Sequence, residues 1–303
     1  MAVQFSAIET NTTDDLFKIK KADAHTFYLC GGVNGSGFIM KSIDAGATWT
    51  VAQNNFPGKI FDLDFINSQK MIAVSEMITF YLTGDEWQSW QYIIPPTGEY
   101  PLTGYDSEMF SIDMVNDSIG FSCGGKQYQH GVIYRTVDGG ITWRYIYKEH
   151  EMKNVLMMDA TTGYASGYGV IYKTADGGDN WNVTSAENDY FTCMAKSESN
   201  HVFAAGYQGS ILDIYNSSDN WSNKNKSNKP FEKRIHFNCI DFYNNKTGAA
   251  AGVNGIIYIT QDGGENWEEG SAFDATQINS IVLTSENSGL AAGAKGKLYK
   301  FQF

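Results

Sequence analysis

The sequence is poor in the residues that mark most metal-binding and membrane proteins. It holds four cysteines, Cys30, Cys123, Cys193 and Cys239, and none lies in a C-x-x-C pair or beside histidine at metal-ligand spacing. We therefore expect free thiols, no bound metal and no cofactor. No apolar run approaches the roughly 18 residues that span a bilayer, and the first residues form neither a basic nor an apolar leader. The chain as given is expected to be soluble, without a membrane span.

Basic charge is also scarce. The chain has 22 Lys and Arg against 34 Asp and Glu, which gives a net charge of -12 and a pI near 4.8. Since phosphate binding needs a basic surface, we expect no affinity for nucleic acid. Charged residues make up only 18% of the chain, whereas aromatic residues reach 14% and glycines number 31. This composition favours many short strands and tight turns over helices or disorder.

A repeated unit is the main feature that the sequence does contain. The stretch I-Y-R-T-V-D-G-G-I-T-W places Thr136, Asp138, Gly140 and Trp143 in a spacing that returns along the chain. We expect a hairpin in which the Asp accepts backbone N–H bonds, the Gly takes a positive φ and the Trp excludes water. One carboxylate per turn is too few for calcium, so the role assigned to these residues is structural. They are Asp44, Asp85, Asp138, Asp176 and Asp262, with Trp49, Trp90, Trp143, Trp181, Trp221 and Trp267.

The pattern resembles the Asp-box, or BNR repeat, of sialidase-like β-propellers. Six boxes, two of them degenerate at Asp85 and Asn216, are spaced by 41, 53, 38, 40 and 46 residues, the size of a four-stranded blade. A further unit begins at Gly296 near the C-terminus and lacks an outer strand, which residues 3–8 can supply. We therefore predict one all-β domain over residues 1–303. It is a seven-bladed propeller of four-stranded antiparallel blades, closed by pairing of the N-terminal strand into the C-terminal blade.

Function is expected on the face opposite the boxes, because binding residues commonly lie on loops that a rigid scaffold holds. Three insertions fall on that face, at Ile94–Ser107, Gly124–Gly131 and Ser222–Arg234. Exposed tyrosines there can stack on sugars or pack against a partner protein. The candidate binding residues are Tyr100, Tyr105, Lys126, Tyr128, His130, Lys229 and Arg234 from the insertions, and His150, Tyr168 and Tyr207 from shorter turns on the same face.

A second hypothesis places chemistry near the ring centre. Glycoside hydrolysis needs two carboxylates at a defined separation, and Asp62 with Asp113 or Asp241 can supply such a pair. Polar residues that line a water-filled channel give the alternative interpretation. Sialidase-like propellers clamp their substrate with three converging arginines. This chain has arginine only at Arg135, Arg144 and Arg234, so a sialidase mechanism is rejected.

The sequence is most similar to the single-domain propellers of the photosystem II stability and assembly factor family and their bacterial relatives. The residues that carry this resemblance are the G-Y-A-S-G strand at Gly163–Gly167 and the boxes at Ile133–Trp143 and Ile171–Trp181. The resemblance implies a non-enzymatic, monomeric scaffold that binds a protein, in a periplasmic, cell-surface or secreted setting. Family members use an arginine-rich patch, which this chain lacks. We thus expect binding of a protein or a glycan, with a glycoside hydrolase as the alternative.

Overall fold

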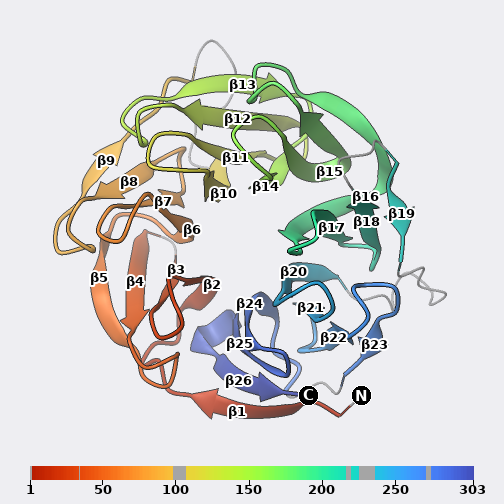
Figure 1. Cartoon of the computed structure of the whole chain (residues 1–303). Helices are drawn as coiled ribbons and strands as arrows, with labels where there is room; N and C mark the ends of the chain where they lie inside the picture. Colours follow the sequence, from red (N-terminus) through yellow and green to blue (C-terminus); the bar gives the residue numbers. More distant parts are fainter. Residues whose placement is uncertain (1, 34, 98–106, 216–219, 225–235, 271–273) are drawn as a thin grey trace.

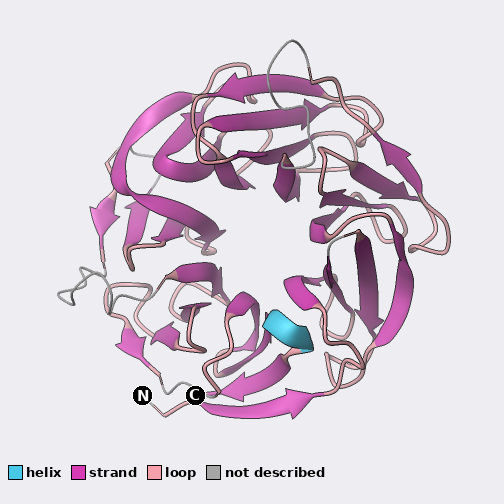
Figure 2. Cartoon of the chain, turned by 180° about the vertical axis from the view of Figure 1, so that it is seen from behind, coloured by secondary structure: helices cyan, strands magenta, loops and turns pink. Residues whose placement is uncertain are grey.

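The structure is a computed structural model of the chain, and it describes all residues except 1, 34, 98–106, 216–219, 225–235 and 271–273. Sheets stand in a ring around a common centre, and each runs from an inner strand to an outer one (Figure 1). A short 3-10 helix, η2 (Ala294–Gly296), lies near the ring centre (Figure 2). Within the described ranges, no helix has the length and apolar character needed to cross a lipid bilayer. The predicted all-β propeller is confirmed.

In the described part of the chain, the strands form five sheets of four strands and one sheet of six. From inner to outer strand, the first two four-stranded sheets are β2 (Asp15–Lys21), β3 (Phe27–Val33), β4 (Ser36–Ser42) and β5 (Thr50–Phe56), and then β6 (Ile60–Phe65), β7 (Met71–Ser75), β8 (Phe80–Thr83) and β9 (Gln91–Ile93). The third is β10 (Glu108–Met114), β11 (Gly120–Lys126), β12 (His130–Thr136) and β13 (Arg144–Lys148). The last two are β20 (Phe237–Phe242), β21 (Gly248–Gly252), β22 (Ile257–Thr260) and β23 (Glu268–Glu269), and then β24 (Ile278–Ser285), β25 (Ser288–Gly293), β26 (Leu298–Gln302) and β1 (Gln4–Ile8). The six-stranded sheet has the order β14 (Met152–Met157), β15 (Gly163–Thr174), β16 (Asn182–Lys196), β17 (His201–Gly206), β18 (Ile211–Tyr215) and β19 (Ser222–Asn223).

The prediction of seven separate four-stranded blades is wrong, because only five of the described sheets are four-stranded blades. From β14 to β19, two repeats of the sequence share one continuous sheet. Strand β16 pairs with β15 near its start and with β17 near its end. Its 15 residues contain no glycine or proline that would interrupt the strand between the two repeats. The six-stranded sheet therefore supplies two inner segments to the ring, β14 and the end of β16.

The predicted closure of the ring by the N-terminal strand is confirmed. Strand β1 pairs antiparallel with β26, from Gln4 opposite Gln302 to Ile8 opposite Leu298. The two ends of the chain consequently lie next to each other (Figures 1 and 2). Phe5 packs against the Phe301 ring of β26, with the ring centroids 6.1 Å apart. This pairing covers the edge that β26 would otherwise expose to other chains.

The boxes form turns that the Asp side chain stabilises, as predicted. Asp138 accepts the backbone N–H of Thr142 at 2.9 Å and the hydroxyl of the same residue at 2.5 Å. Gly140 donates its N–H to the Thr136 hydroxyl at 2.9 Å and has a φ of +87°. This left-handed conformation favours glycine, and a Cβ at Gly140 would lie 2.8 Å from the end of the Ile72 side chain. Equivalent Asp bonds occur at Asp44, Asp85, Asp176 and Asp262, while residues 216 and 218 of the remaining box lie outside the described residues.

The box at Asp85 keeps this geometry without glycine. Glu86 and Trp87 take positive φ values of 56° and 71°. Trp87 donates its backbone N–H to the Thr83 hydroxyl at 3.0 Å, the same bond that glycine makes in the other boxes. Its indole is fully buried and packs edge-on against Phe56, with centroids 5.6 Å apart. Burial of the indole offsets the left-handed backbone, which costs roughly 1–2 kcal/mol per residue.

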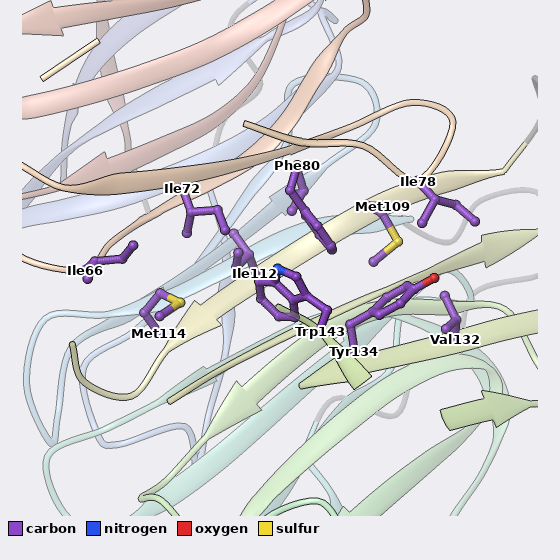
Figure 3. Close-up of a cluster of buried hydrophobic side chains, with 11 residues drawn as sticks. Ile66, Ile72, Ile78, Phe80, Met109, Ile112, Met114, Val132, Tyr134 and Trp143 are labelled. Atoms are coloured by element: carbon purple, nitrogen blue, oxygen red, sulfur yellow. The ribbon is translucent and has the colours of Figure 1, made fainter. Parts of the chain in front are cut away.

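The box tryptophans also join neighbouring sheets. The Trp143 indole donates to the Gly140 carbonyl at 3.0 Å, which closes its own hairpin. The same ring stacks on Phe80 of the adjacent sheet, with centroids 4.6 Å and planes 26° apart. Figure 3 shows both rings in the buried cluster between the sheet β6–β9 and the sheet β10–β13. The box at Asp138 thus stabilises both its own turn and an interface between two sheets.

The inner strands carry a common pattern. The predicted apolar column is buried between sheets, with at most 7% of any member exposed: Ile19, Leu63, Ile112, Val155, Met194, Ile240 and Ile281. Two residues earlier, the pairing register of every inner strand shifts by one residue, which marks a β-bulge. The bulged residues are Phe17, Phe61, Phe110, Lys153, Thr192, Asn238 and Asn279.

Candidate functional site

The turns of the sheets divide into two faces. Box turns lie against the first hairpin of their own sheet, where Gly139 donates its N–H to the Ser118 carbonyl at 2.9 Å. The turns between second and third strands lie instead against the segments that enter an inner strand, where Tyr207 donates its N–H to the Tyr190 carbonyl at 2.9 Å. Because antiparallel strands alternate in direction, these two sets of turns lie at opposite strand ends. We name them the box face and the loop face.

Four tyrosines gather on the loop face, and we name them the tyrosine cluster. Tyr128 lies 5.1 Å from Tyr168 and 5.7 Å from Tyr190, measured between ring centroids. Tyr190 also contacts Tyr168 at 5.5 Å and Tyr207 at 6.5 Å, so it is the centre of the cluster. Tyr128, Tyr168 and Tyr207 remain 54%, 46% and 42% exposed. Large aromatic rings that stay half exposed while packed together are typical of binding surfaces.

The tyrosine cluster lines a cavity of about 610 Å³ on the loop face. The remaining walls are Gly169, Asn188, Asp189 and Gln208. Gly169 has a φ of +75°, and a Cβ built on it would meet nothing within 4 Å, so the cavity wall is open there. Ligand pockets in proteins commonly measure about 300–1,000 Å³, so this cavity can accept several side chains of a ligand.

Asp189 fixes two walls of the cavity. Its carboxylate accepts the backbone N–H of Tyr190 at 2.7 Å and that of Gln208 at 2.7 Å, and it also accepts the hydroxyl of Ser210. The residue is only 4% exposed. Burial raises the pKa of Asp189, although these hydrogen bonds oppose the shift. The Asp189 carboxylate therefore stabilises the loops around the cavity and is not available to bind a ligand.

An ion pair lies beneath the tyrosines. Glu151 accepts the backbone N–H of Tyr128 at 2.8 Å and pairs with the Lys153 ammonium at 3.0 Å. The Lys153 ammonium lies 5.7 Å from the centroid of Tyr190. Burial lowers the pKa of Lys153, while Glu151 opposes the change, and burial raises the pKa of Tyr190. This pair holds Tyr128 in its left-handed conformation, with a φ of +66°.

Aromatic rings continue from the cluster toward the ring centre. The Lys153 ammonium lies 3.2 Å from the centroid of Phe110. Phe110 contacts Phe61 at 5.6 Å, and Phe61 contacts Phe17 at 5.2 Å. All three phenylalanines are partly exposed bulge residues of neighbouring inner strands. The loop face therefore carries a continuous aromatic arc, formed by Phe17, Phe61, Phe110, Lys153 and the tyrosine cluster.

The structure brings together three of the residues proposed from the sequence, Tyr128, Tyr168 and Tyr207. His130 bonds through Nδ1 to the Tyr147 hydroxyl of β13 at 2.9 Å and does not line the cavity. Lys126, which ends β11, and His150, in the connection before β14, are also not cavity residues. The candidates outside the described residues are Tyr100, Tyr105, Lys229 and Arg234, together with most of the insertions at Ile94–Ser107 and Ser222–Arg234.

The sequence reasoning missed Tyr190 and Asp189. Tyr190 stands directly before Phe191, the buried residue at which β16 begins to pair with β17. His236 has the equivalent place before Phe237, and its ring stacks on Tyr207 at 3.6 Å between centroids. An alignment of the inner strands extended by one residue toward their start would have placed Tyr190 and His236 in one column on the loop face.

The carboxylates considered for catalysis are bound to the backbone. Asp62 accepts an N–H of β10 at 3.2 Å, Asp113 accepts one of β14 at 2.6 Å, and Asp241 accepts one of β24 at 2.7 Å. Each bond joins one inner strand to the next. Burial raises the pKa of Asp241 to about 6, and burial together with the neighbouring Asp64 carboxylate raises the pKa of Asp113.

The described ranges contain His, Cys, Asp and Glu side chains, the usual metal ligands. No set of three or more His, Cys, Asp or Glu side chains there is arranged to hold a metal ion. Cys30, Cys123, Cys193 and Cys239 are buried and free. Burial raises the pKa of all four thiols, which makes them unreactive as nucleophiles.

Solved structures with the same fold include binding proteins and an enzyme. YCF48 bound to D1 peptide is 20% identical with a TM-score of 0.75, and the match covers 99% of this chain and 97% of that one. YCF48 from Cyanidioschyzon merolae is 16% identical with a TM-score of 0.74, and the match covers 98% of both chains. A catalytically inactive virginiamycin B lyase from Staphylococcus aureus, with quinupristin, is 11% identical with a TM-score of 0.76 over 99% of both chains. At these identities the likeness establishes the fold and not the activity.

Sequence comparison gives the family. No curated protein sequence matches the chain. A family model described as photosynthesis system II assembly factor YCF48 matches residues 129–302, which is more than half of the chain. This range includes most residues of the tyrosine cluster and the boxes at Asp138, Asp176 and Asp262. The chain therefore belongs to the family of the photosynthesis system II assembly factor YCF48.

Proposed function

We propose that the chain is a non-catalytic scaffold that binds a protein partner through the tyrosine cluster on the loop face. The observation that carries this proposal is the cavity of about 610 Å³, in which three half-exposed tyrosines surround a fourth. Tyrosine offers a large contact area at low entropic cost, because it has few rotatable bonds and a polar hydroxyl at its tip. The supporting bonds of Glu151 and Asp189 hold the rings in place before a ligand arrives.

The chemistry of the cavity favours an extended peptide segment. Aromatic-lined grooves recognise extended segments that contain proline or aromatic residues. The cavity lining includes one charged residue, Asp189, and no basic residue. A peptide segment rich in Asp and Glu is therefore disfavoured as the ligand. In this respect the cavity differs from the arginine-rich patch that the family resemblance implies. The structure of the family member YCF48 bound to D1 peptide supports a peptide as the class of ligand.

A glycan is the second candidate ligand, because the exposed faces of Tyr128, Tyr168 and Tyr207 offer stacking surfaces for sugar rings. Catalysis on such a glycan has weaker support. Asp62, with 1% of its surface exposed, accepts backbone N–H bonds from two residues, which leaves it poorly placed to act as an acid or nucleophile. The family is that of an assembly factor, which also favours a binding role.

The test is selection of peptides from a displayed random library against the full chain. Selected peptides are then measured by fluorescence polarisation against the wild type and the variants Tyr128→Ala and Tyr207→Ala. The matched control is Tyr92→Ala, because Tyr92 is a 62% exposed tyrosine on the outer strand β9. We expect binding to weaken at least about tenfold in the two cavity variants and to stay unchanged in the control.

Two results would overturn the proposal. One is peptides whose affinity is the same for the cavity variants and the wild type. The other is binding of sugars from an oligosaccharide array at the cavity while no peptide is selected. That result would favour a glycan as the ligand of this site.

A further inference from the structure

A second feature of the ring concerns the hydrogen bonds that tie its inner strands together. One residue before the apolar column, four side chains accept a backbone N–H from the next inner strand. The acceptors are Asp62 to Ile112 at 3.2 Å, Ser111 to Val155 at 3.4 Å, Asn154 to Met194 at 3.0 Å and Ser280 to Ile19 at 3.1 Å. The side chains in this column therefore have a structural role in most of the ring.

Strand β2 departs from this pattern at Lys18. A lysine ammonium has only donors, so it cannot accept the N–H of Leu63 on the next inner strand. That N–H is instead bonded to the Asp62 carboxylate at 2.9 Å. Within the part of the chain that the structure describes, the Lys18 ammonium takes part in no hydrogen bond or ion pair. The Lys18 side chain lines one cavity together with Asp241 of β20 and Met194 of β16, which places it toward the middle of the ring. Burial raises the pKa of Asp241, and the charge of Lys18 opposes this shift.

Lys18 lines a cavity of about 390 Å³ between the inner strands. The cavity is formed by the later halves of β2, β14, β16, β20 and β24. Inner strands run toward the hairpins that touch the box turns, so this cavity lies at the box end of the ring centre, whereas the tyrosine cluster lies on the loop face. The two sites are separate.

The residues that line the cavity include more lysines than carboxylates, and the carboxylates of Asp62, Asp64 and Asp113 lie near Lys20 behind this lining. The charged lining residues are Lys18, Lys20, Lys21, Lys196 and Asp241. Lys20 is already paired, at 3.9 Å from Asp62 and 3.5 Å from Asp64.

Two further lysines flank Lys18 in this cavity. Lys196 donates to the Met157 carbonyl at 3.1 Å and keeps two further N–H groups. Lys21 lies 5.9 Å from the Tyr243 ring at the rim. On the neighbouring wall, Asp113 is bound to a backbone N–H of β14. Among the described residues, Lys18, Lys21 and Lys196 are lining lysines without an ion pair, and the lining holds one carboxylate, Asp241.

We propose that this cavity is a binding site for a small oxyanion that carries carboxylate or phosphate groups. Lys18 is the principal contact, and Lys196 and Lys21 flank it. Charges of one sign inside a low-dielectric wall concentrate counter-ions of the other sign. A volume of about 390 Å³ suits a small molecule and excludes a folded partner. The proposal is independent of the peptide site on the loop face.

The experiment titrates the full chain with citrate and, separately, with inorganic phosphate at constant ionic strength. Binding is measured by calorimetry on the wild type and on Lys18→Met, which keeps the aliphatic stem and removes the charge. The control is Lys300→Met on the exposed side of β26. We expect saturable binding of at least one probe by the wild type and the control, and a loss of at least about tenfold in affinity in Lys18→Met. Binding of phosphate without citrate, or the reverse, identifies the class of anion.

Equal affinity in Lys18→Met and the wild type would overturn the proposal, as would heats no larger than those produced by chloride. If Lys18→Met does not fold, the proposal is tested by the changes in the amide chemical shifts of the wild type when each probe is added. Citrate or phosphate should then shift the amides of residues 18–21, 194–196 and 240–243. Unchanged shifts there with both probes would also overturn the proposal.

Discussion

At the scale of single residues, the box Asp is a turn former. The carboxylate of Asp138 accepts bonds from Thr136 and from both the backbone and the hydroxyl of Thr142. The pKa of Asp44 falls to about 2 because it accepts bonds from the hydroxyl and then the backbone of Thr48. The Asp residues of the other described boxes have the same environment. This role in the turn explains why Asp is repeated, without a role in ligand binding.

Replacing Asp138 by Ala should lower the free energy of unfolding by about 1 kcal/mol, because the turn loses bonds to a charged acceptor at an exposed site. Urea denaturation measures this change. The control is Asp117→Ala, an exposed Asp near the same turn that should change stability by less than about 0.5 kcal/mol. Peptide binding should stay the same in both variants. A loss of binding in Asp138→Ala without a loss of stability would contradict the structural role.

Asp241 predicts a pH effect of opposite sign to that of the box Asp residues. Its pKa is raised to about 6, whereas an unfolded Asp ionises near pH 4. Between these values the folded chain binds more protons than the unfolded chain, so this group makes stability fall as pH rises from about 4 to 6. In Asp241→Asn the amide oxygen can still accept the Leu283 N–H, and no charge is buried.

The free energy of unfolding of the wild type, measured by urea denaturation, should therefore decrease from pH 4.5 to pH 7 by more than that of Asp241→Asn, with a difference of up to about 2 kcal/mol. Asp117→Asn provides the control for the loss of an exposed charge. Parallel pH profiles for the wild type and Asp241→Asn would show that Asp241 titrates normally.

At the scale of elements, the box hairpin packs its Trp side chain between two neighbouring sheets. Trp143 is 6% exposed, stacks on Phe80 of the neighbouring sheet and bonds to its own turn. Trp143→Ala should cost about 3–5 kcal/mol, because it leaves a cavity between two sheets. Thermal and urea unfolding measure the loss, and Tyr92→Ala on the exposed surface of β9 should cost almost nothing. A small effect for Trp143→Ala would mean that the Trp143 indole does not stabilise the interface between the two sheets.

The sequence predicted these hairpins well because the box is local. The residue types at Thr136, Asp138 and Gly140 determine the turn by themselves, and even the degenerate box at Asp85 keeps the geometry. Tyr128 was proposed because it lies in an insertion that interrupts the repeat, and Tyr168 and Tyr207 because they lie in shorter turns on the same face.

What was not predictable depends on register and on neighbours. A β-bulge at Phe61 or Phe110 changes which face the following residues occupy, and no residue type signals it. Asp62 therefore resembled a channel carboxylate in the sequence, whereas the structure buries it against β10. The continuous strand β16 likewise gave no signal, because an uninterrupted run fits one long strand or two short ones equally well. Tyr190 lies on this strand just before the inner segment that repeats in the sequence, and an alignment limited to that segment missed it.

At the scale of the whole molecule, the ring depends on the pairing of β1 with β26. Deleting residues 1–8 should lower stability by several kcal/mol, because β26 loses its partner and Phe5 leaves the core. The exposed edge should also promote association between chains, which light scattering after size exclusion would detect. Removal of residues 1 and 2 alone is the control. A stable monomer without β1 would contradict the proposed closure.

Our proposal assigns peptide recognition to the loop face, whereas the Asp of the box turns stabilises the fold. Hydrogen–deuterium exchange with a selected peptide tests this division most directly. Protection is predicted at residues 126–131, 168–170, 188–190 and 206–208, with box turns 42–49, 136–143 and 174–181 unchanged. Protection of the box turns, with no change around Tyr128, Tyr190 and Tyr207, would contradict the account.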